Sequence, residues 1–450
     1  MTAIAGDVRA VPEISTRSIV AVVIGNWFEF YDFIVYTFFA AMIAEAFFPG
    51  NDQPLKLLLS LLVFWFGFFA RPVGAAVIGA YADRVGRRAA LTVTLLMMAV
   101  GSAIVGLTPT YASIGIWAPV MLLVGRLVQG FSCGGEVGPA TTYLMEGAPP
   151  HRRAALTSWQ GQSQQLASIS GAGLGVILAF TLSHDDLFAW GWRVPFLIGT
   201  LIAPVGLYIR SQLPETIEPS ETHESATAVL GNLLRHHSSA VILGMFVICG
   251  GTVSTYVFNF MTTYAISQGV SLKVATLLTF TGAMASMPGL WLGATMTDRL
   301  PRKPVLILTR LVYIAAILPA WYVISAVHGS ASCGPSAVPM LEASTGLDLC
   351  WLDTSALTLI GLNMGLNFLF SVGVGGTYVF LTEAFPKAVR SSGLAILYAL
   401  AVTIFGGSTQ PIILWLSKFD PLMPAWYQIA ANVAATVAVY FLVRHKDADR

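Results

Sequence analysis

Apolar residues occur along this chain in long continuous runs that are separated by short polar turns. A helix needs about 20 apolar residues to cross a hydrocarbon core about 30 Å thick, and each run is long enough for that. The runs do not alternate between apolar and polar positions, so the pattern excludes a transmembrane β-barrel. We therefore predict an all-α membrane protein with twelve transmembrane helices, at 19–41, 57–81, 89–109, 114–144, 156–182, 194–212, 239–265, 273–297, 304–327, 355–381, 391–417 and 424–444.

The composition indicates a membrane protein independently of this pattern. Hydrophobic residues make up 56% of the chain and charged residues 10%, with a mean hydropathy of +0.72. Soluble domains carry about 25% charged residues. The formal net charge is only +1, and the basic residues lie in short loops rather than in one patch, so no nucleic-acid partner is expected.

Two charged turns occur twice in the chain. The turn around Asp83, from Gly79 to Arg88, returns 215 positions later around Asp298. A second motif recurs after 237 positions, as Glu146-x-x-Pro149-x-x-x-Arg153 and Glu383-x-x-Pro386-x-x-x-Arg390. Two halves with matching turns between apolar helices indicate a duplicated membrane transporter, in which one half rocks against the other.

The duplication divides the chain at a polar stretch with several prolines that begins at Leu213. We expect two six-helix bundles related by a pseudo-two-fold axis, joined by a cytoplasmic linker and flanked by short cytoplasmic tails. The predicted units are a tail at 1–18, a first bundle at 19–212, the linker at 213–238, a second bundle at 239–444 and a tail at 445–450.

The lysines and arginines predict the orientation of the helices. If the first residue is cytoplasmic, eighteen of the 24 basic residues fall on the cytoplasmic side and four on the outer side. Positive loops stay in the cytoplasm, so both termini are expected there, in the cell inner (plasma) membrane. The first apolar run contains Glu29 and Asp32 and has no cleavage pattern, so we expect it to remain as the first helix.

The repeated turns have a mechanical interpretation. Their glycines and proline end the helices, and their cations lie where they can pair with acidic groups that separate when the halves rock. The alternative is that these cations only fix the topology. The residues assigned to gating are Asp83, Arg84, Arg87, Arg88, Arg71, Glu146, Arg153, Asp298, Arg299, Glu383 and Arg390.

Ionisable residues inside the spans are costly to bury and therefore indicate function. The second half offers only neutral polar groups away from its helix ends, whereas the first half has Glu29, Asp32, Arg71, Arg126 and Glu136. At about 1.5 Å per residue, Glu29 lies about 16 Å from the cytoplasmic side and Arg126 about 14 Å from the outer side. Both are therefore expected near the middle of the bilayer, where they can meet.

A buried arginine near two carboxyl groups has two interpretations. It can form a structural ion pair, or a carboxyl group that takes up a proton can release Arg126 to bind a substrate carboxylate through two hydrogen bonds. The second interpretation gives proton coupling directly and is preferred. Proton coupling is assigned to Asp32, Glu29 and Glu136. Substrate binding is assigned to Arg126, Gln129, Asn26, Tyr36, Gln160, Gln164, Asn363 and Asn367.

Two cysteines, Cys333 and Cys350, fall in the long predicted outer loop after the ninth span. An oxidising exterior allows a disulfide between them, and two free thiols fit the sequence equally well, because pairing cannot be read from spacing. The sequence contains no recognisable metal-ligand cluster, nucleotide-binding loop, or nucleophile with a base. No metal, cofactor or catalytic residue is predicted, and an enzyme is not expected.

Several motifs, in order along nearly the whole chain, resemble the metabolite:proton symporter family of the major facilitator superfamily. They are Gly25-Asn26-x-x-Glu29-x-x-Asp32-Phe33, Ala70-Arg71-Pro72-x-Gly74, Gly125-Arg126-x-x-Gln129-Gly130-Phe131-Ser132-x-Gly134-Gly135-Glu136, Trp190-Gly191-Trp192-Arg193-x-Pro195-Phe196 and Leu213-Pro214-Glu215-Thr216. Residues 157–165 and 404–407 look most like the branch of citrate and other tricarboxylate proton symporters. The chain departs from the family where Ala294 and Pro301 replace the glycines of the second turn.

The resemblance implies the major facilitator fold and a proton-coupled symporter that imports a small organic carboxylate by alternating access. Citrate, another tricarboxylate or a dicarboxylate is expected, and Arg126 and the amide side chains suit such an anion. One alternative is uptake of a zwitterionic osmolyte such as proline or betaine, for which the aromatic residues of the first span would form a cage. Another alternative is an efflux antiporter. The expected partners are a small-molecule organic acid, protons and the lipid bilayer, and a monomer is expected.

Overall fold

The computed structural model describes residues 16–85, 87–135, 137–211, 231, 235–326, 354–386 and 389–443. Within these ranges the chain is helical, and each of the twelve predicted spans coincides with helix. The helices of the first half are α1 (Thr16–Phe38), α2 (Ala40–Phe47), α3 (Gln53–Val85), α4 (Arg87–Leu107), α5 (Tyr111–Ile114), α6 (Trp117–Ser132), α7 (Val137–Glu146), α8 (Arg153–Thr157), α9 (Trp159–Thr181), α10 (His184–Ala189) and α11 (Val194–Ser211).

The second half repeats this pattern with different interruptions. Its helices are α13 (Ser238–Asn259), α14 (Met261–Ser267), α15 (Leu272–Arg299), α16 (Arg302–Ala326), α18 (Thr354–Val374), α19 (Thr377–Thr382), α20 (Arg390–Ala401), α21 (Gly407–Leu416) and α22 (Met423–Phe441). A π-helical turn, Val402–Gly406, joins α20 to α21. Such turns are frequent at functional sites.

Several predicted parts fall outside the described residues and stay predictions. These are most of both tails and of the linker, and the loop with Cys333 and Cys350. By length and apolar composition alone, six of the described helices can cross a membrane, or seven if the bent pair of α1 and α2 counts as one span. The other predicted spans coincide with shorter, interrupted or less apolar helices.

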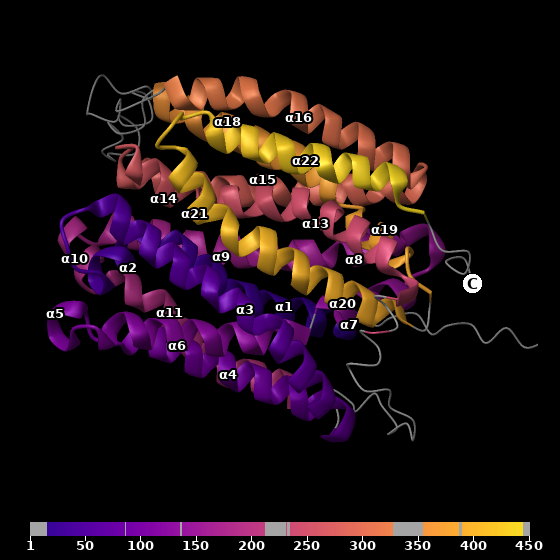
Figure 1. Ribbon diagram of the computed structural model, residues 1–450, viewed down its shortest axis with the longest axis horizontal. Coiled ribbons are helices and arrows are strands. Elements are labelled where there is room, and N and C mark those ends of the chain that lie inside the picture. The colour runs from indigo at the N-terminus through magenta and orange to yellow at the C-terminus, as the bar shows by residue number, and fades with distance from the viewer. Residues whose placement is uncertain are drawn as a thin grey trace, which may run out of the picture.

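Figure 1 shows how the two halves lie beside each other. The first-half helices α4, α6 and α11 form one edge, and the second-half helices α16, α18 and α22 form the other, with α1, α9, α13 and α15 between them (Figure 1). Helices α7, α8, α19 and α20 lie at one end, which we call the turn end, and α2, α5, α10 and α14 lie at the opposite end. The long helices therefore run roughly parallel to the line that joins the two ends.

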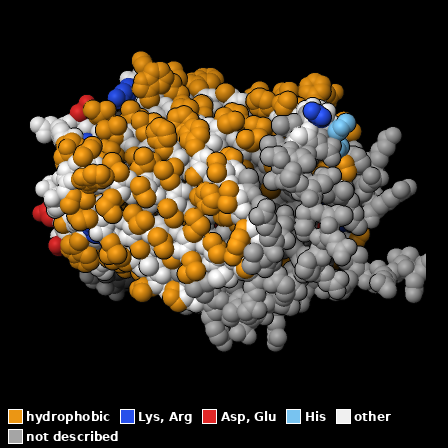
Figure 2. Space-filling view, turned by 60° about the horizontal axis from the view of Figure 1, so that its bottom comes forward, with side chains coloured by type: hydrophobic (Ala, Val, Ile, Leu, Met, Phe, Trp, Pro, Cys, Tyr) orange, Lys and Arg blue, Asp and Glu red, His pale blue; other side chains and the backbone are white. Residues whose placement is uncertain are grey.

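The outer surface of the bundle is apolar along its middle. Figure 2 shows hydrophobic side chains over most of the described part of one face, with the charged side chains near its two ends. Large side chains such as Phe66, Trp291 and Leu308 are more than half exposed although they belong to long helices. An exposed apolar belt of this extent fits a lipid environment and not water.

Glycines allow helices to approach closely within each half. In the first half, a Cβ atom added to Gly130 of α6 would overlap the carbonyl oxygen of Gly67 in α3. In the second half, a Cβ atom on Gly293 of α15 would overlap the carbonyl oxygen of Val372 in α18. Small residues at helix crossings are the usual means by which membrane helices gain packing contacts.

Replacing Gly130 by alanine is expected to force α3 and α6 apart and to lower stability by about 1–3 kcal/mol or more, as overpacking does. Gly361→Ala on α18 is the matched control, because nothing lies within 4 Å of a Cβ atom added there. The check is the thermal unfolding midpoint of each purified variant in detergent. Equal midpoints for the two variants would contradict this account of the α3–α6 crossing.

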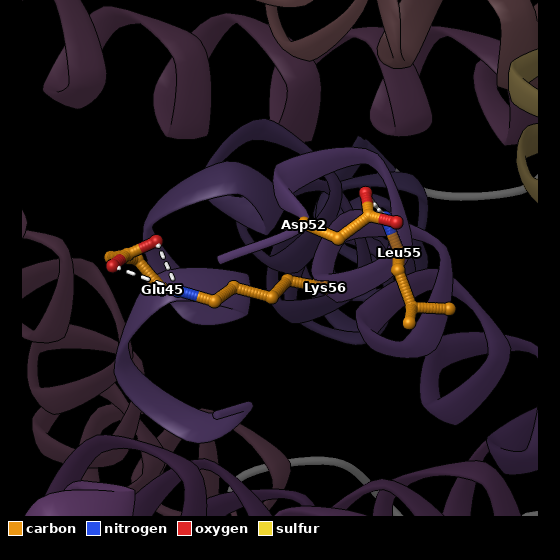
Figure 3. Close-up of polar contacts among 4 residues, drawn as sticks. All are labelled: Glu45, Asp52, Leu55 and Lys56. Carbon is orange, nitrogen blue, oxygen red and sulfur yellow. Dashed lines mark hydrogen bonds and ion pairs between the residues drawn. The ribbon is translucent and has the colours of Figure 1, made fainter. Parts of the chain in front are cut away.

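A sharp bend separates α1 from α2. The two helices differ in direction by 66°, with Phe39 at the break. Figure 3 shows how α2 is then tied to α3: Lys56 Nζ donates to both carboxylate oxygens of Glu45 at 3.0 Å, and Asp52 accepts a hydrogen bond from the Leu55 amide at the start of α3. The bend and its ion pair therefore fix the opposite end of the first half.

Two seams join the halves along their length. In one seam, Gln162 of α9 donates to the Met287 carbonyl of α15 at 3.0 Å. In the other, Trp65 of α3 donates to the Thr403 carbonyl at 3.0 Å, and the Thr403 hydroxyl donates to the Phe68 carbonyl at 3.1 Å. The space between these seams holds the central cavity.

Candidate functional site

A cavity lies between the two halves. It is lined by residues of α1, α9, α13, α15, α18, α19 and α20, and the empty space among them is about 870 Å³, including the part open to solvent. Its described lining contains no charged side chain. Its hydroxyl and amide groups belong to Thr37, Gln164, Gln165, Ser168, Thr252, Thr255, Tyr256, Asn259, Ser371, Thr377, Tyr378 and Tyr398.

Two arginines lie behind one aromatic side chain of this lining. Phe33 of α1 lines the cavity, and its ring centroid is 4.5 Å from Arg126 Cζ and 4.4 Å from Arg71 Cζ. Arg126 also lies over the rings of Tyr36 and Phe64, at 4.6 and 4.9 Å. Aromatic faces attract a desolvated guanidinium group. A single layer of rings therefore separates both cations from the cavity.

A chain of hydrogen bonds connects Arg126 to Asp32. Arg126 Nη1 donates to Gln129 Oε1 at 2.6 Å, and Gln129 Nε2 donates to Ser102 Oγ at 3.0 Å. Ser102 Oγ in turn donates to Asp32 Oδ2. The members come from α6, α4 and α1, so three helices of the first half are linked through one buried polar chain. Changes in the charge of Asp32 can thus be felt at Arg126 through these groups.

Some polar atoms of Arg126 and Asp32 are not used in this chain of hydrogen bonds. Among the described residues, Arg126 Nε and Nη2 and Asp32 Oδ1 have no hydrogen-bond partner, and both side chains are buried. Gly199 of α11 lies against the carboxylate, since a Cβ atom added there would be 2.8 Å from Asp32 Oδ1. Buried polar atoms without partners are costly. These atoms are therefore candidates to receive a proton or a substrate.

Several residues assigned to substrate binding pair with each other instead of lining the cavity. Gln160 Nε2 donates to Asn26 Oδ1 at 2.7 Å, and Asn26 Nδ2 donates back to the Gln160 carbonyl at 3.1 Å and to Ser163 Oγ at 2.5 Å. The Tyr36 hydroxyl donates to the Ser60 carbonyl at 3.0 Å. In this conformation Asn26 and Gln160 tie α1 to α9, and their role in binding stays a prediction.

Gln164 and the second-half asparagines lie nearer to the cavity. Gln164 lines it and donates across the halves to the Tyr378 hydroxyl at 3.3 Å. Asn363 donates to the Leu278 carbonyl at 2.7 Å, and Asn367 donates to the Asn363 carbonyl at 2.8 Å. Asn367 also lines a smaller adjoining pocket that shares Gln165 with the main cavity. This pocket extends the polar surface into the second half.

Two of the predicted proton-coupling residues are placed less fully. Glu29 is buried on α1, one turn before Asp32. Glu136 lies outside the described residues, between Gly135 and the start of α7. Their assignments remain predictions.

The residues assigned to gating lie mostly at the turn end. The side chains of Asp83, Arg84, Arg87 and Arg88 fall outside the described part of the structure. Arg390 Nη1 is 3.6 Å from Glu146 Oε1, which joins α20 to the last residue of α7 across the halves. Glu383 is buried and pairs with Arg302 within the second half, whereas Arg299 is exposed.

Asp298 makes a two-point contact between the halves at this end. Its two carboxylate oxygens accept hydrogen bonds from the amides of Ala154 and Ala155, at 2.8 and 2.9 Å. These amides belong to the first turn of α8, which begins at Arg153, so an acid of the second half caps a helix of the first half. A carboxylate is favourable at a helix N-terminus because the free amides point toward it.

Replacing Asp298 by asparagine is expected to favour opening at the turn end by about 1–3 kcal/mol, because two charge-assisted hydrogen bonds between the halves are weakened. The measurement is the rate at which a cysteine introduced at Ser168, in the cavity wall, reacts with a polar maleimide in the purified protein. Asp185→Asn is the control, since Asp185 is exposed on α10 at the opposite end. An unchanged rate would assign Asp298 to helix capping alone.

One buried cation was missed by the sequence reasoning. Arg310 is one of the eighteen basic residues that the sequence assigns to the cytoplasmic side, and the second half is expected to hold no charge away from its helix ends. The structure corrects this: Arg310 is 2% exposed, eight residues inside α16. Arg310 is buried because it lies well inside the helix: a position eight residues from a helix start is about 12 Å along the helix axis. Ser102 was also missed, since a serine in an apolar run carries no spacing signal.

Solved structures show which fold this is. The crystal structure of a D-xylose-proton symporter matches with a TM-score of 0.69, covering 96% of this chain and 98% of that chain at 18% sequence identity. The fold is that of the major facilitator transporters, with twelve transmembrane helices in two related six-helix bundles.

Closer relatives identify the family. The citrate-proton symporter of Klebsiella pneumoniae is 35% identical over 435 residues, which cover 95% of this chain and 91% of the relative. The ectoine/proline transporter ProP of Corynebacterium glutamicum is 29% identical, covering 97% of this chain and 86% of the relative. The sequence profile described as "Sugar (and other) transporter" matches residues 18–241. The chain belongs to this family, among the metabolite:proton symporters of the major facilitator superfamily, and it is a multi-pass, proton-coupled transporter rather than an enzyme.

Proposed function

We propose that this protein imports a small organic carboxylate together with protons by alternating access. The observation that supports this most directly is the buried chain from Asp32 through Ser102 and Gln129 to Arg126, one ring layer from the cavity. It places a protonatable acid and an anion-binding group in one hydrogen-bonded unit. Similarity to citrate-proton symporters over nearly the whole chain points to the same class of cargo.

The coupling follows from charge. With Asp32 ionised, the negative carboxylate offsets the positive guanidinium group of Arg126, so the unit has no net charge to attract an anion. When Asp32 takes up a proton, the unit gains one positive charge in a site shielded from water, where electrostatic attraction is strong. Arg126 Nε and Nη2 then offer two donors that match a carboxylate. Proton uptake thus promotes substrate binding, and substrate binding promotes proton uptake to the same extent.

The path to the guanidinium group requires movement of Phe33. Its ring lines the cavity on one side and covers Arg126 and Arg71 on the other. A side-chain rotation of Phe33, with rearrangement of Tyr36 and Phe64, would open Arg126 to the cavity. In the proposed cycle this rearrangement accompanies binding, and the halves then rock about the occupied site.

Contacts between the halves exist on both sides of the cavity. Glu146–Arg390 and the Asp298 cap lie at the turn end. Toward the opposite end, Thr263 Oγ1 donates to the Thr37 carbonyl at 2.9 Å. Alternating access requires these two sets to open in turn. We assign the turn end to the cytoplasm, with both termini there, and the protein to the cell inner membrane as a monomer.

A second candidate is uptake of a zwitterionic osmolyte. Aromatic rings of Phe30, Tyr256, Tyr378 and Tyr398 line the cavity, and such rings attract quaternary ammonium groups. ProP of Corynebacterium glutamicum, a transporter of ectoine and proline, is a relative over nearly the whole chain. The buried acid and arginine beside the cavity favour the carboxylate.

Proteoliposome uptake tests the proposal. Labelled citrate, 2-oxoglutarate and betaine are presented with and without an imposed pH gradient, acidic outside. We expect accumulation of at least one of the two acids that depends on the gradient. Accumulation of betaine alone would establish the osmolyte function, and movement of substrate without any response to the gradient would contradict coupling through Asp32.

A further inference from the structure

The second half holds a buried cation of its own beside the cavity. Arg310 Nη2 donates to Thr377 Oγ1 at 3.3 Å and to the Val247 carbonyl at 3.5 Å. Both Thr377 and Val247 line the cavity. Arg310 therefore lies directly behind the second-half wall, as Arg126 lies behind Phe33 in the first half.

Arg310 has little to compensate its charge. Its two hydrogen bonds are long and use one nitrogen, and Nε and Nη1 have no partner among the described residues. No carboxylate in the described part of the chain forms an ion pair with it, whereas Arg126 is linked to Asp32 through Gln129 and Ser102. Burial of an arginine without a counterion is strongly unfavourable. A buried arginine without a permanent counterion suggests that its partner is an anion that binds and leaves, such as a substrate.

The helix beside Arg310 leaves room for its side chain. Gly373 of α18 faces the stem of Arg310, and a Cβ atom added there would lie 3.4 Å from Arg310 Cγ. Because residue 373 is a glycine, the space beside the stem of Arg310 is left to Arg310, whose guanidinium group already touches two residues of the cavity wall. Breaking the weak hydrogen bond to Thr377 would allow the guanidinium group of Arg310 to bind an anion in the cavity.

We propose that Arg310 is the anion-binding residue of the second half and that it holds one carboxylate of a substrate with at least two. This inference rests on the proposed function and narrows it to polycarboxylates. The two cations then act differently: no carboxylate in the described ranges pairs with Arg310, which provides a standing anion site, whereas Arg126 becomes available when Asp32 is protonated. A substrate that reaches both cations contacts both halves, which gives it a means to draw them together around it.

The test compares citrate with its monoamide, in which one carboxylate is replaced by an uncharged carboxamide of nearly the same shape. Equilibrium binding of labelled citrate to the purified protein is measured, with unlabelled citrate or the monoamide as competitor. The wild type is expected to prefer citrate by about tenfold or more, the worth of one charge-assisted contact. Arg310→Gln is expected to bind citrate about tenfold more weakly and to lose this preference.

Controls separate a binding role from a structural one. Arg152→Gln removes an exposed arginine near the turn end and is expected to leave both affinities unchanged. If Arg310→Gln does not fold, Arg310→Lys is used instead, because lysine keeps the charge and lacks the planar guanidinium group. This variant is expected to fold and to show a partly reduced preference for citrate. An unchanged preference in a folded Arg310 variant would overturn the inference while leaving the proposed function intact. A wild type that binds neither citrate nor 2-oxoglutarate would overturn both.

Discussion

Replacing Arg126 by glutamine is expected to abolish substrate accumulation, with the initial rate lowered at least about 100-fold, while the protein still inserts and purifies normally. The variant loses the group proposed to bind the carboxylate and leaves Asp32, to which Arg126 is connected through Gln129 and Ser102, without its balancing charge. A buried charge left without its partner costs about 2–5 kcal/mol. Glutamine keeps a polar amide at a shorter reach, so the variant removes the charge together with the two-pronged donor that a carboxylate needs. The measurement is uptake of labelled citrate into proteoliposomes under an imposed pH gradient.

Arg193→Gln is the matched control for this variant. Arg193 is a partly buried arginine that donates to the carbonyl groups of Gly106 and Thr108 in the first half, away from the cavity. Its loss is expected to lower stability more than transport. Normal uptake by Arg126→Gln would remove Arg126 from the site, and equal losses in both variants would reduce its role to folding.

Replacing Asp32 by asparagine is expected to separate substrate movement from proton movement. Asparagine resembles the protonated carboxyl group in shape and in having both a donor and an acceptor, so Ser102 keeps a partner and Arg126 keeps its net charge. Exchange of labelled for unlabelled substrate should therefore continue, whereas the pH gradient no longer drives accumulation. One pH unit is worth 1.36 kcal/mol per proton, so the lost accumulation is about tenfold per unit for each proton coupled.

The control for the aspartate variant is Asp185→Asn, which removes an exposed carboxylate and is expected to change neither exchange nor accumulation. The decisive comparison is the ratio of exchange to gradient-driven uptake in the same preparation. A variant that loses both activities equally would show that Asp32 is needed for binding or folding. A variant that keeps both would move the proton-coupling role to another acid, and Glu29 is the next candidate.

The sequence was sufficient for the fold because membrane spans carry a strong signal. Continuous apolar runs of bilayer length occur in few other contexts, and the duplicated turns around Asp83 and Asp298 revealed the two halves directly. The first-half acids and arginines were also recognisable, since charges such as Asp32 and Arg126 are conspicuous in an apolar segment.

The sequence could not show which buried polar side chains form hydrogen bonds with each other. Spacing placed Asn26 and Gln160 among the polar groups of the first half, and it could not show that they satisfy each other. It also could not show that Ser102 of α4 completes the connection between Asp32 and Arg126, because that depends on how three helices are rotated. Arg310 was misplaced although the predicted span 304–327 already contained it, because the sequence does not show whether a long side chain near a helix end extends to the cytoplasm or turns into the protein.

Interruptions within the spans were equally hard to predict. Hydropathy predicts one continuous span at 391–417, whereas the structure divides it into α20, a π-helical turn and α21. The adjacent glycines Gly406 and Gly407 are the visible signal, and Gly407 is where α21 packs against Trp65 and Phe68 of the other half. The irregular turn thus depends on a contact between halves that local sequence does not encode.

The contacts on the two sides of the cavity differ in chemistry, and this gives the transporter an unequal response to salt. The turn end is held by the Glu146–Arg390 pair and by the Asp298 carboxylate, whereas toward the other end Thr263 binds a carbonyl group of Thr37, just before the break at Phe39. Rising ionic strength screens partly exposed charges and scarcely affects a hydroxyl–carbonyl bond. Electrolyte is therefore expected to loosen the turn end selectively, so the balance between the two closures of the carrier should shift with the ionic strength around it.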